Sequence, residues 1–301
     1  MEIKIVVACF KKDIHLARIC VASVRYWYPD IDIYLLKDLS FGDFSTREIE
    51  INFNCKIFKT KRKKFGWPWS KLEVLFHEEK ALWLFIDSDI VFVGRVLDNF
   101  SEVGYSTFCV TGEKLPSESD PEINANYLNI ELVKSKINQD YLYPGFVFNG
   151  GQILISSGLL TQHDFADVIS FDIEIKNKFP EIFKHGDQGI LNYKLSSLHQ
   201  QKRINLVYLD FWAWPNTPLA KSFNLDEIGN KKSRPYLIHW AGMKPIKFSK
   251  TPHIEILNFY ENYYYNRIRF SFLKKNFRKL KMNSISFIKI SKYKLFNLKY
   301  N

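Results

Sequence analysis

The chain has 301 residues, of which 46% are hydrophobic and 25% charged, and its formal net charge is +11. This composition supports one large or two small globular domains with an apolar core and argues against a disordered chain. The four cysteines form no Cys-x-x-Cys pair, so we expect a reducing compartment and no disulfide framework. No run of about 18 apolar residues occurs, and the first residues resemble a strand, so we expect neither a membrane-spanning helix nor a signal peptide.

The positive charge is concentrated at the C-terminal end. Eleven of the 43 Lys and Arg residues follow Glu261, and no acidic residue does. The rest of the chain therefore balances its basic residues against all 32 acidic residues. A function that depends on this charge, such as binding to an anionic surface, is expected to reside in the tail.

The first third of the chain alternates strand and helix patterns. Ile3–Cys9 is a continuous apolar run, typical of a strand that is buried on both faces. A helical spacing over Asp13–Tyr28 and a second strand over Ile31–Leu36 follow. A helix over Trp69–Glu79 then leads into a third buried strand, Ala81–Ile86. This order predicts an α/β fold with a parallel sheet of the nucleotide-binding type.

The middle of the chain is less regular. Thr111–Tyr143 is polar and interrupted by prolines, which predicts a long loop with one short helix. Phe146–Phe148 and Gln152–Ile155 resemble two strand pieces interrupted by Asn149-Gly150-Gly151. We further expect helices over Leu159–Phe179 and Asp187–Leu198, and strands over Ile204–Leu209 and Pro235–Trp240.

Two carboxylates follow the third buried strand directly. Asp87 and Asp89 are separated by one residue, so both side chains point the same way if the backbone stays extended. Such a pair suits a hard cation such as Mg²⁺ or Mn²⁺, which prefers oxygen ligands and can also bind phosphate oxygens. The alternative is a turn with two solvated acids.

Three further motifs contain polar residues and glycines near predicted strand or helix ends. In His239-Trp240-Ala241-Gly242-Met243-Lys244-Pro245, a nitrogen ligand precedes a glycine and a lysine that could contact phosphate. In His185-Gly186-Asp187-Gln188-Gly189-Ile190-Leu191-Asn192, the aspartate could be a helix N-cap, or Asp187 and Gln188 could contact a sugar. Phe148-Asn149-Gly150-Gly151 could be an ordinary turn or bulge between strand pieces.

Taken together and in this order, the four motifs resemble those of the family-8 glycosyltransferases, which include glycogenin and bacterial lipopolysaccharide glucosyl- and galactosyltransferases. The resemblance extends over roughly residues 3–246. It implies a GT-A type nucleotide-binding domain over residues 1–250, with a mixed, mainly parallel sheet flanked by helices. Residues 251–301 would form a basic, aromatic, helical tail for membrane association or docking.

The resemblance also implies roles for individual residues. Asp87, Asp89 and His239 correspond to the ligands of a Mn²⁺ (or Mg²⁺) ion, and Gly242 and Lys244 to contacts of the donor diphosphate. The remaining expected donor contacts are Ala8 at the nucleoside, Lys71, Asn149 and Gly150 at the donor, and Asp187 and Gln188 at the reacting sugar.

The implied activity is transfer of a hexose, with retention of configuration, from a nucleotide sugar such as UDP-glucose or UDP-galactose. The acceptor would be a saccharide, and a lipid-linked surface glycan such as lipopolysaccharide is favoured. The sequence offers no unambiguous nucleophile: Gln188 is a poor one, and Asp187 is the one acid of the motifs that is not a metal ligand. We therefore favour attack of the acceptor on the same face of the sugar, with a nucleophilic role for either residue left open.

The tail has the pattern of a basic amphipathic helix. Over Asn266–Met282, Phe270, Leu273, Phe277 and Leu280 recur at helical spacing, with Lys and Arg between them. Such a helix suits an anionic membrane surface, so we expect residues 266–301 to bind the cytoplasmic face of a membrane as a peripheral segment. The alternatives are docking on the protein's own body and, less favoured, binding to nucleic acid.

Two other functions remain as alternatives. A sugar-phosphate nucleotidyltransferase has a similar sheet and metal carboxylates, but it usually has a glycine-rich loop after the first strand, and Ala8–Asp13 contains no glycine. The other alternative is a non-catalytic protein that binds a membrane or nucleic acid and retains a vestigial sugar site.

Overall fold

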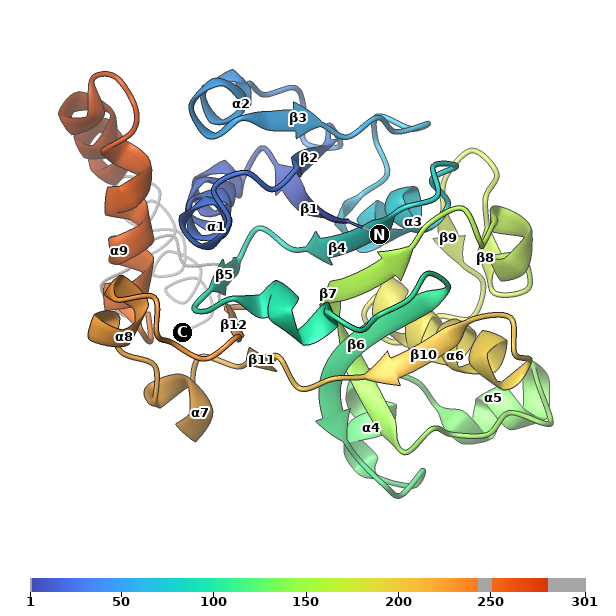
Figure 1. The fold of residues 1–301 in the computed structure, drawn as a ribbon. Coiled ribbons are helices and arrows are strands. Elements are labelled where there is room, and N and C mark those ends of the chain that lie inside the picture. Colours follow the sequence, from blue (N-terminus) through green and yellow to red (C-terminus); the bar gives the residue numbers. More distant parts are fainter. Residues whose placement is uncertain (1, 243–250, 281–301) are drawn as a thin grey trace, which may run out of the picture.

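The computed structural model describes residues 2–242 and 251–280, and it contains a central seven-stranded sheet (Figure 1). The strand order is β10-β6-β7-β4-β1-β2-β3. β7 runs antiparallel to β4 and β6, whereas the other neighbouring pairs are parallel. The strands of this sheet are β1 (Ile3–Phe10), β2 (Ile33–Asp38), β3 (Cys55–Ile57), β4 (Leu82–Ile86), β6 (Thr107–Lys114), β7 (Phe146–Ser156) and β10 (Asn205–Tyr208).

Helices cover both faces of the sheet. The α-helices are α1 (Ile14–Trp27), α2 (Arg47–Phe53), α3 (Ser70–Leu75), α4 (Pro121–Asn126), α5 (Ile130–Lys136), α6 (Asp187–Gln200), α7 (Pro218–Lys221), α8 (Leu225–Gly229) and α9 (Ile254–Tyr265). α1 and α9 contribute to one apolar core, and α3 and α6 contribute to the other.

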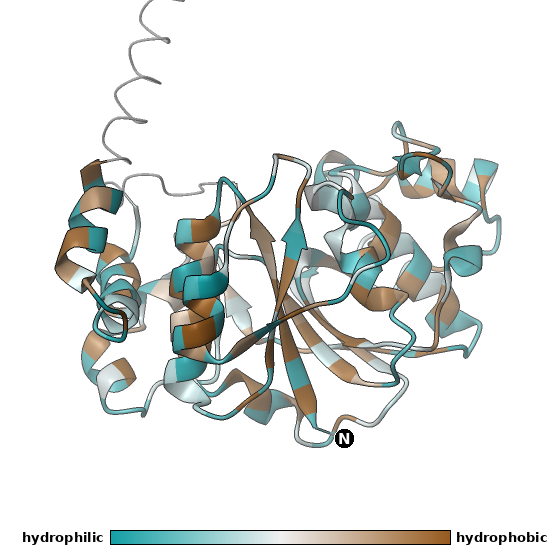
Figure 2. Cartoon of the chain, turned by 90° about the horizontal axis from the view of Figure 1, so that it is seen from above, coloured by the Kyte–Doolittle hydropathy of each residue, from teal (hydrophilic) through white to brown (hydrophobic). Residues whose placement is uncertain are grey.

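The apolar run of β1 is continuous because each face of the strand enters a different core. Ile5 and Val7 pack in the core that contains α1, whereas Val6 and Ala8 pack in the core that contains α3 and α6. Successive side chains of a strand point to opposite faces, so a strand between two helical layers needs apolar residues at every position. Figure 2 shows hydrophobic residues along the central strands.

A small second sheet extends from the end of β4. It has the order β11-β12-β5 and consists of β11 (Trp212–Ala213), β12 (Leu237–His239) and β5 (Ile90–Phe92). β5 follows β4 after the three residues 87–89, and β12 pairs with it in antiparallel register, with His239 opposite Ile90. The turn between the two sheets therefore lies next to the end of β12.

The expected strands and most expected helices of the first half are confirmed, with shifted ends. The predicted helix Trp69–Glu79 is shorter: a 3-10 turn over Trp67–Trp69 leads into α3, which ends at Leu75. The prediction of two strand pieces interrupted by Asn149-Gly150-Gly151 was wrong, because β7 is continuous over eleven residues. The motif is a bulge instead: Val110 of β6 is opposite Ile153 and Gly112 is opposite Phe148, so the extra residues of β7 between these two pairs include Asn149-Gly150-Gly151.

Two expectations for the middle of the chain were also wrong. The predicted loop at 111–143 contains the end of β6 and two short helices, α4 and α5, whose first turns are capped by the side chains of Asp120 and Asn129. Leu159–Phe179 is not a helix. It contains a 3-10 turn (Gln162–Phe165) and the hairpin of β8 (Ile169–Ser170) and β9 (Lys176–Asn177).

Local side-chain hydrogen bonds explain the missing helix. Asp164 accepts hydrogen bonds from the backbone and hydroxyl of Thr161, and Asn177 accepts one from the backbone N–H of Phe179. Such bonds compete with the backbone pattern of a helix. The apolar residues of the segment, among them Phe165 and Val168, are buried individually in the second core.

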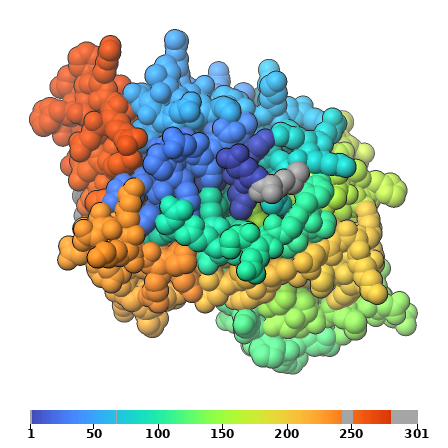
Figure 3. All heavy atoms as spheres, viewed as in Figure 1, coloured from blue at the N-terminus to red at the C-terminus, as the bar shows by residue number. Residues whose placement is uncertain are grey.

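The C-terminal part of the described chain lies against the N-terminal helices (Figure 3). α9 packs on α1, and Tyr260 of α9 is fully buried and accepts a hydrogen bond from the indole N–H of Trp27 at 2.9 Å. Residues 266–270 form a turn, and residues 271–280 form a further helix. Residues 281–301, which include Met282, lie outside the described residues. Within the described ranges, no helix is long and apolar enough to cross a membrane.

Candidate functional site

A cavity of about 600 Å³ opens where the two sheets meet. Three polypeptide segments form its centre: the turn Asp87–Asp89 after β4, the stretch Asn149–Gly151 in β7, and the end of β12. The carboxyl ends of β1 and β4 are adjacent in the parallel part of the sheet, so side chains that follow them project into one crevice. The carboxyl end of a parallel sheet is the usual place of a ligand site in this type of fold.

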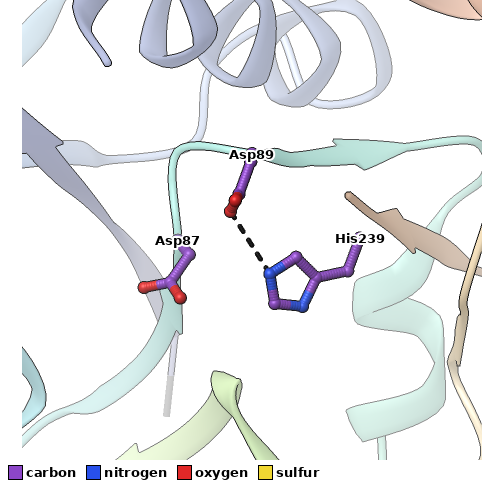
Figure 4. Close-up of side chains that lie close together, drawn as sticks. All are labelled: Asp87, Asp89 and His239. Atoms are coloured by element: carbon purple, nitrogen blue, oxygen red, sulfur yellow. Dashed lines mark ion pairs between the residues drawn. The ribbon is translucent and has the colours of Figure 1, made fainter. Parts of the chain in front are cut away.

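Asp87, Asp89 and His239 converge at the base of this cavity (Figure 4). One ligand atom of each lies within 4.8 Å of those of the other two, and His239 Nε2 is 3.2 Å from Asp89 Oδ1. Backbone hydrogen bonds hold the three in place. The N–H of Asp87 donates to Gly151 O at 2.8 Å, and the N–H of Trp240 donates to Asp89 O at 3.0 Å.

The residues fit a divalent cation. His239 is buried, and its Nδ1 has no hydrogen-bond partner among the described residues, whereas its Nε2 faces Asp89 Oδ1. A buried polar atom without a partner is costly, and a metal ion would satisfy it. Two carboxylates and one imidazole are a donor set that Mn²⁺ and Mg²⁺ accept, and such a set leaves coordination positions for phosphate oxygens.

Gly151 allows β7 to approach this group closely. A Cβ atom at this position would lie 2.3 Å from His239 Cε1 and 3.0 Å from Asp87 Oδ2. Any other residue would therefore displace at least one of the three converging side chains. The second glycine of the Asn-Gly-Gly motif is therefore required because His239 and Asp87 lie against it, which the sequence pattern alone did not reveal.

A buried ion pair lies beside the three converging residues. Lys71 Nζ is 2.8 Å from Asp187 Oδ2, and both side chains are at most 3% exposed. Burial by itself lowers the pKa of Lys71, but the carboxylates of Asp187, Asp87 and Asp89 raise it above its usual value, so the ammonium is charged at neutral pH. Burial raises the pKa of Asp187 to about 6, although the ammonium of Lys71 opposes this shift.

Gln188 is held between two elements by its side-chain amide. Its Oε1 accepts a hydrogen bond from the N–H of Gly150 at 3.3 Å, and its Nε2 donates one to the carbonyl of Asn126 at 3.2 Å. Asn149 accepts a hydrogen bond from the N–H of Gly151 at 2.8 Å. The amide groups of the two motifs therefore orient the backbone of β7 around the cavity.

The sequence-predicted residues are mostly brought together, with two exceptions. Nine of the predicted site residues line the cavity: Asp87, Asp89, His239, Lys71, Asn149, Gly150, Asp187, Gln188 and Gly242. Ala8 does not: it is buried within β1, and Phe10, two residues further along, lines the cavity instead. Lys244 lies outside the described residues, so its role stays a prediction.

Sequence analysis missed several residues of the cavity wall. Phe10, Glu113, Asn126, Tyr127 and Trp214 line the cavity although no motif contains them. Asn192 is the last residue of the motif that begins at His185, but no role was assigned to it. Its amide exchanges two 2.9 Å hydrogen bonds with the backbone N–H and carbonyl of Phe148, and it thereby fixes α6 to β7. The signal in the sequence was its position one helical turn after Gln188.

Neither family models nor curated protein sequences match the chain. Solved structures do. The galactosyltransferase LgtC, in complex with donor and acceptor sugar analogs, aligns with 87% of this chain and 95% of its own, at a TM-score of 0.53 and 17% identity. The glycosyltransferase GlyE of Streptococcus pneumoniae TIGR4 aligns with 88% of this chain, at a TM-score of 0.51 and 16% identity.

The bifunctional glycosyltransferase WbbM aligns with 87% of this chain, at a TM-score of 0.50 and 15% identity. This chain spans 60% of the GlyE chain and 49% of the WbbM chain. The protein therefore has the GT-A glycosyltransferase fold, and the resemblance to family-8 glycosyltransferases is confirmed at the level of the fold.

Proposed function

We propose that the protein transfers a hexose from a nucleotide sugar to a saccharide acceptor, with a divalent cation bound by Asp87, Asp89 and His239. The observation that carries this proposal is the convergence of the three ligand atoms within 4.8 Å, next to the buried Lys71–Asp187 pair. The fold of LgtC, which was solved with donor and acceptor sugar analogs, supports the same class of reaction.

When bound, Mn²⁺ or Mg²⁺ would neutralise negative charge on the diphosphate of the donor. Gly242 lines the cavity with a φ of +74°, a conformation that favours glycine, and its backbone is available to phosphate oxygens. Lys244 would add a positive charge to the same diphosphate, as the resemblance implies. Charge that is already in place when the bond breaks stabilises the transition state most.

Asp187, Asn149 and Gln188 are proposed to hold the donor hexose, with Lys71 keeping Asp187 ionised and oriented. A carboxylate and two amides can accept and donate hydrogen bonds to several hydroxyl groups. Gly150 has no side chain, and a Cβ there would lie 3.2 Å from Lys71 Cε. The donor is proposed to be UDP-glucose or UDP-galactose, and Phe10 is available to the nucleoside near the predicted position of Ala8.

Retention is proposed to proceed by attack on the same face of the sugar. The bond between the anomeric carbon and the diphosphate breaks, the acceptor oxygen forms the new bond, and the hydroxyl proton passes to the departing diphosphate. The environment of the two candidate nucleophiles favours this route. Asp187 is neutralised by Lys71, and the amide of Gln188 is committed to hydrogen bonds with Gly150 and Asn126. A covalent hexosyl adduct on either residue would contradict this mechanism.

Release of UDP from a panel of nucleotide sugars tests the proposal. We expect release from one donor with Mn²⁺, no release with EDTA, and a loss of at least a hundredfold in Asp89→Ala. Asp140→Ala is the matched control, because this aspartate is exposed and does not line the cavity. Pyrophosphate formation from a sugar phosphate and a nucleoside triphosphate would instead identify a nucleotidyltransferase. No turnover and no Mn²⁺-dependent UDP binding would indicate a vestigial site.

We also propose that the basic tail binds an anionic membrane surface and brings a glycolipid acceptor, such as a lipopolysaccharide precursor, to the cavity. The support comes from which side chains of the helix at 271–280 face the body and which face solvent. It contacts the body through charged groups, Lys274 with Glu48 at 2.6 Å and Arg278 with Glu261. Its large apolar side chains are exposed to solvent instead. These are Phe272, Leu273, Phe277 and Leu280. Exposed apolar side chains flanked by lysines suit an anionic lipid surface.

Sedimentation with vesicles tests this part of the proposal. We expect binding to vesicles that contain anionic lipid, little binding to neutral vesicles, and loss of binding when Phe272, Leu273, Phe277 and Leu280 are replaced by serine. A variant with Leu142→Ser and Ile173→Ser is the control, because these two residues are exposed and apolar and lie outside the tail. Binding that persists in the tail variant would contradict the proposed membrane contact.

A further inference from the structure

One wall of the cavity contains a tryptophan that no sequence motif singled out. Trp214 follows β11 directly, and β11 pairs with β12 so that Ala213 is opposite Ile238. Trp214 is therefore beside the metal ligand His239. The two rings are stacked, with centroids 5.9 Å apart and an interplanar angle of 17°.

The indole ring of Trp214 is fixed but not enclosed. Trp212 packs against it with ring centroids 4.5 Å apart, which together with His239 leaves the ring little freedom to rotate. The side chain nevertheless stays half-buried and lines the cavity. A large aromatic surface that is held rigidly at a ligand cavity offers contact area at low cost in conformational entropy.

The position of Trp214 in the cavity matches the acceptor end. Phe10, at the end of β1, lies on the side of the sheet where β1 and β2 pair. Trp214 lies on the opposite side: its strand β11 follows β10 after three residues, and β10 pairs with β6 at the far edge of the sheet. If the nucleoside occupies the β1 side and the hexose lies above the three metal ligands, the remaining part of the cavity is bounded by Trp214.

We propose that Trp214 is the platform on which a pyranose ring of the acceptor stacks, which makes it a specificity-determining residue of the transfer. This inference rests on the proposed function. The C–H groups on one face of a pyranose form an apolar surface with partial positive charge, and the face of an indole ring is apolar and partly negative. Stacking would place the acceptor hydroxyl next to the metal ligands without any charged contact. The substrate class is therefore a saccharide with an accessible pyranose ring near its acceptor hydroxyl.

The test compares wild type, Trp214→Ala and Trp214→Phe with methyl glucosides, methyl galactosides, lactose and maltose as probes. We expect at least one probe to act as acceptor, with a KM about tenfold or more higher in Trp214→Ala and within about threefold of wild type in Trp214→Phe. Hydrolysis of the donor without acceptor and the affinity for Mn²⁺ should be unchanged in both variants. Ile173→Ala, which removes a fully exposed apolar side chain outside the cavity, should behave as wild type.

Two other outcomes would overturn the inference. Equal acceptor KM values in wild type and Trp214→Ala would exclude a platform. Weaker Mn²⁺ binding with an unchanged acceptor KM would mean that Trp214 only packs against His239. Saturation-transfer NMR with the same saccharides separates this inference from the proposed function, because it needs no turnover. Saccharide signals that depend on Trp214 would support the platform even if no donor is hydrolysed, and their absence for every probe would refute it.

Discussion

At the scale of single residues, the cavity depends on a few positions where chemistry and space must both be right. His239 Nδ1 has no hydrogen-bond partner among the described residues, and Gly151 leaves room for the imidazole ring beside β7. Asp87 and Asp89 were foreseen because they follow a buried strand. The need for glycine at position 151 was not foreseen, because it arises from contact with His239 and Asp87, which are far from Gly151 in the chain.

Gly151→Ala is expected to impair metal binding. The added Cβ would overlap with His239 and crowd Asp87, so at least one ligand must move. We expect the affinity for Mn²⁺, measured by calorimetric titration, to fall at least tenfold, with a corresponding loss of turnover. Gly104→Ala is the control, because a Cβ there meets no atom within 4 Å. Unchanged Mn²⁺ affinity in Gly151→Ala would contradict the proposed ligand set.

Asp187 is expected to set the acid limit of activity. Its pKa is raised to about 6, so the carboxylate is ionised above this pH and becomes neutral as the pH falls through it. A neutral Asp187 no longer attracts Lys71 and loses acceptor capacity toward the sugar. Donor hydrolysis at saturating Mn²⁺ should therefore decline below pH 6. In Asp187→Asn, the residual rate should show no decline below pH 6. A decline that persists unchanged would assign the titration to another group.

At the scale of elements, the site depends on how α6 is attached to β7. Asp187 is the first residue of α6, so its carboxylate also lies at the positive end of the helix dipole. Gly189 allows α6 to approach the segment before α5, since a Cβ there would lie 2.1 Å from the carbonyl of Tyr127. Asn192 then joins the helix to the backbone of Phe148. In the motif Gly-Asp-Gln-Gly-Ile-Leu-Asn, Asp187 and Gln188 therefore line the cavity, whereas Gly189 and Asn192 attach α6 to its neighbours.

Asn192→Ala is expected to loosen this attachment. It leaves the backbone N–H and carbonyl of Phe148 without their 2.9 Å partners in a buried position. We expect a loss of about 1–3 kcal/mol in the free energy of unfolding, measured with urea, and a higher KM for the donor. Asn230→Ala, at an exposed asparagine, should change neither quantity. A variant that is destabilised while its donor KM is unchanged would show that the attachment does not position the site.

At the scale of the whole molecule, the expected tail is not uniform. α9 belongs to the same core as α1: Ile256 and Tyr260 are fully buried, and Tyr264 stacks on Phe53 with ring centroids 4.7 Å apart. The helix at 271–280 has its large apolar residues in solvent. A domain boundary near residue 250, as expected from the sequence, would separate α9 from the core in which it packs.

Two substitutions distinguish these parts of the tail. Ile256→Ala should lower the free energy of global unfolding by about 2–5 kcal/mol, because it leaves a cavity in the core around α1. Phe272→Ala, at a side chain that is 76% exposed, should change it by less than about 0.5 kcal/mol. Urea unfolding followed by far-UV circular dichroism measures both. If Ile256→Ala leaves the free energy of global unfolding unchanged, α9 does not belong to the cooperatively folded core.

The sequence by itself determined the local features: the buried strands, the carboxylates after β4 and the basic charge of the tail. These follow from hydrophobic periodicity and from residues that lie close together in the chain. The helix expected over Leu159–Phe179 failed because short side-chain hydrogen bonds outweighed weak helical propensity. The break expected at Asn149-Gly150-Gly151 takes the form of a bulge: pairing with β4 extends to Gln152, pairing with β6 resumes at Phe148, and the strand stays continuous between them.

Only the tertiary structure decided which distant residues meet. The pairing of β12 with β5 brings His239 to Asp89, the burial of Lys71 against Asp187 joins α3 to α6, and β11 carries Trp214 to the cavity wall. No single segment contains these relations, because each arises from packing between elements that are separated by dozens of residues. Resemblance to known motifs anticipated the first of them. The second and third required the fold, since an ion pair and a ring contact depend on the distance between atoms.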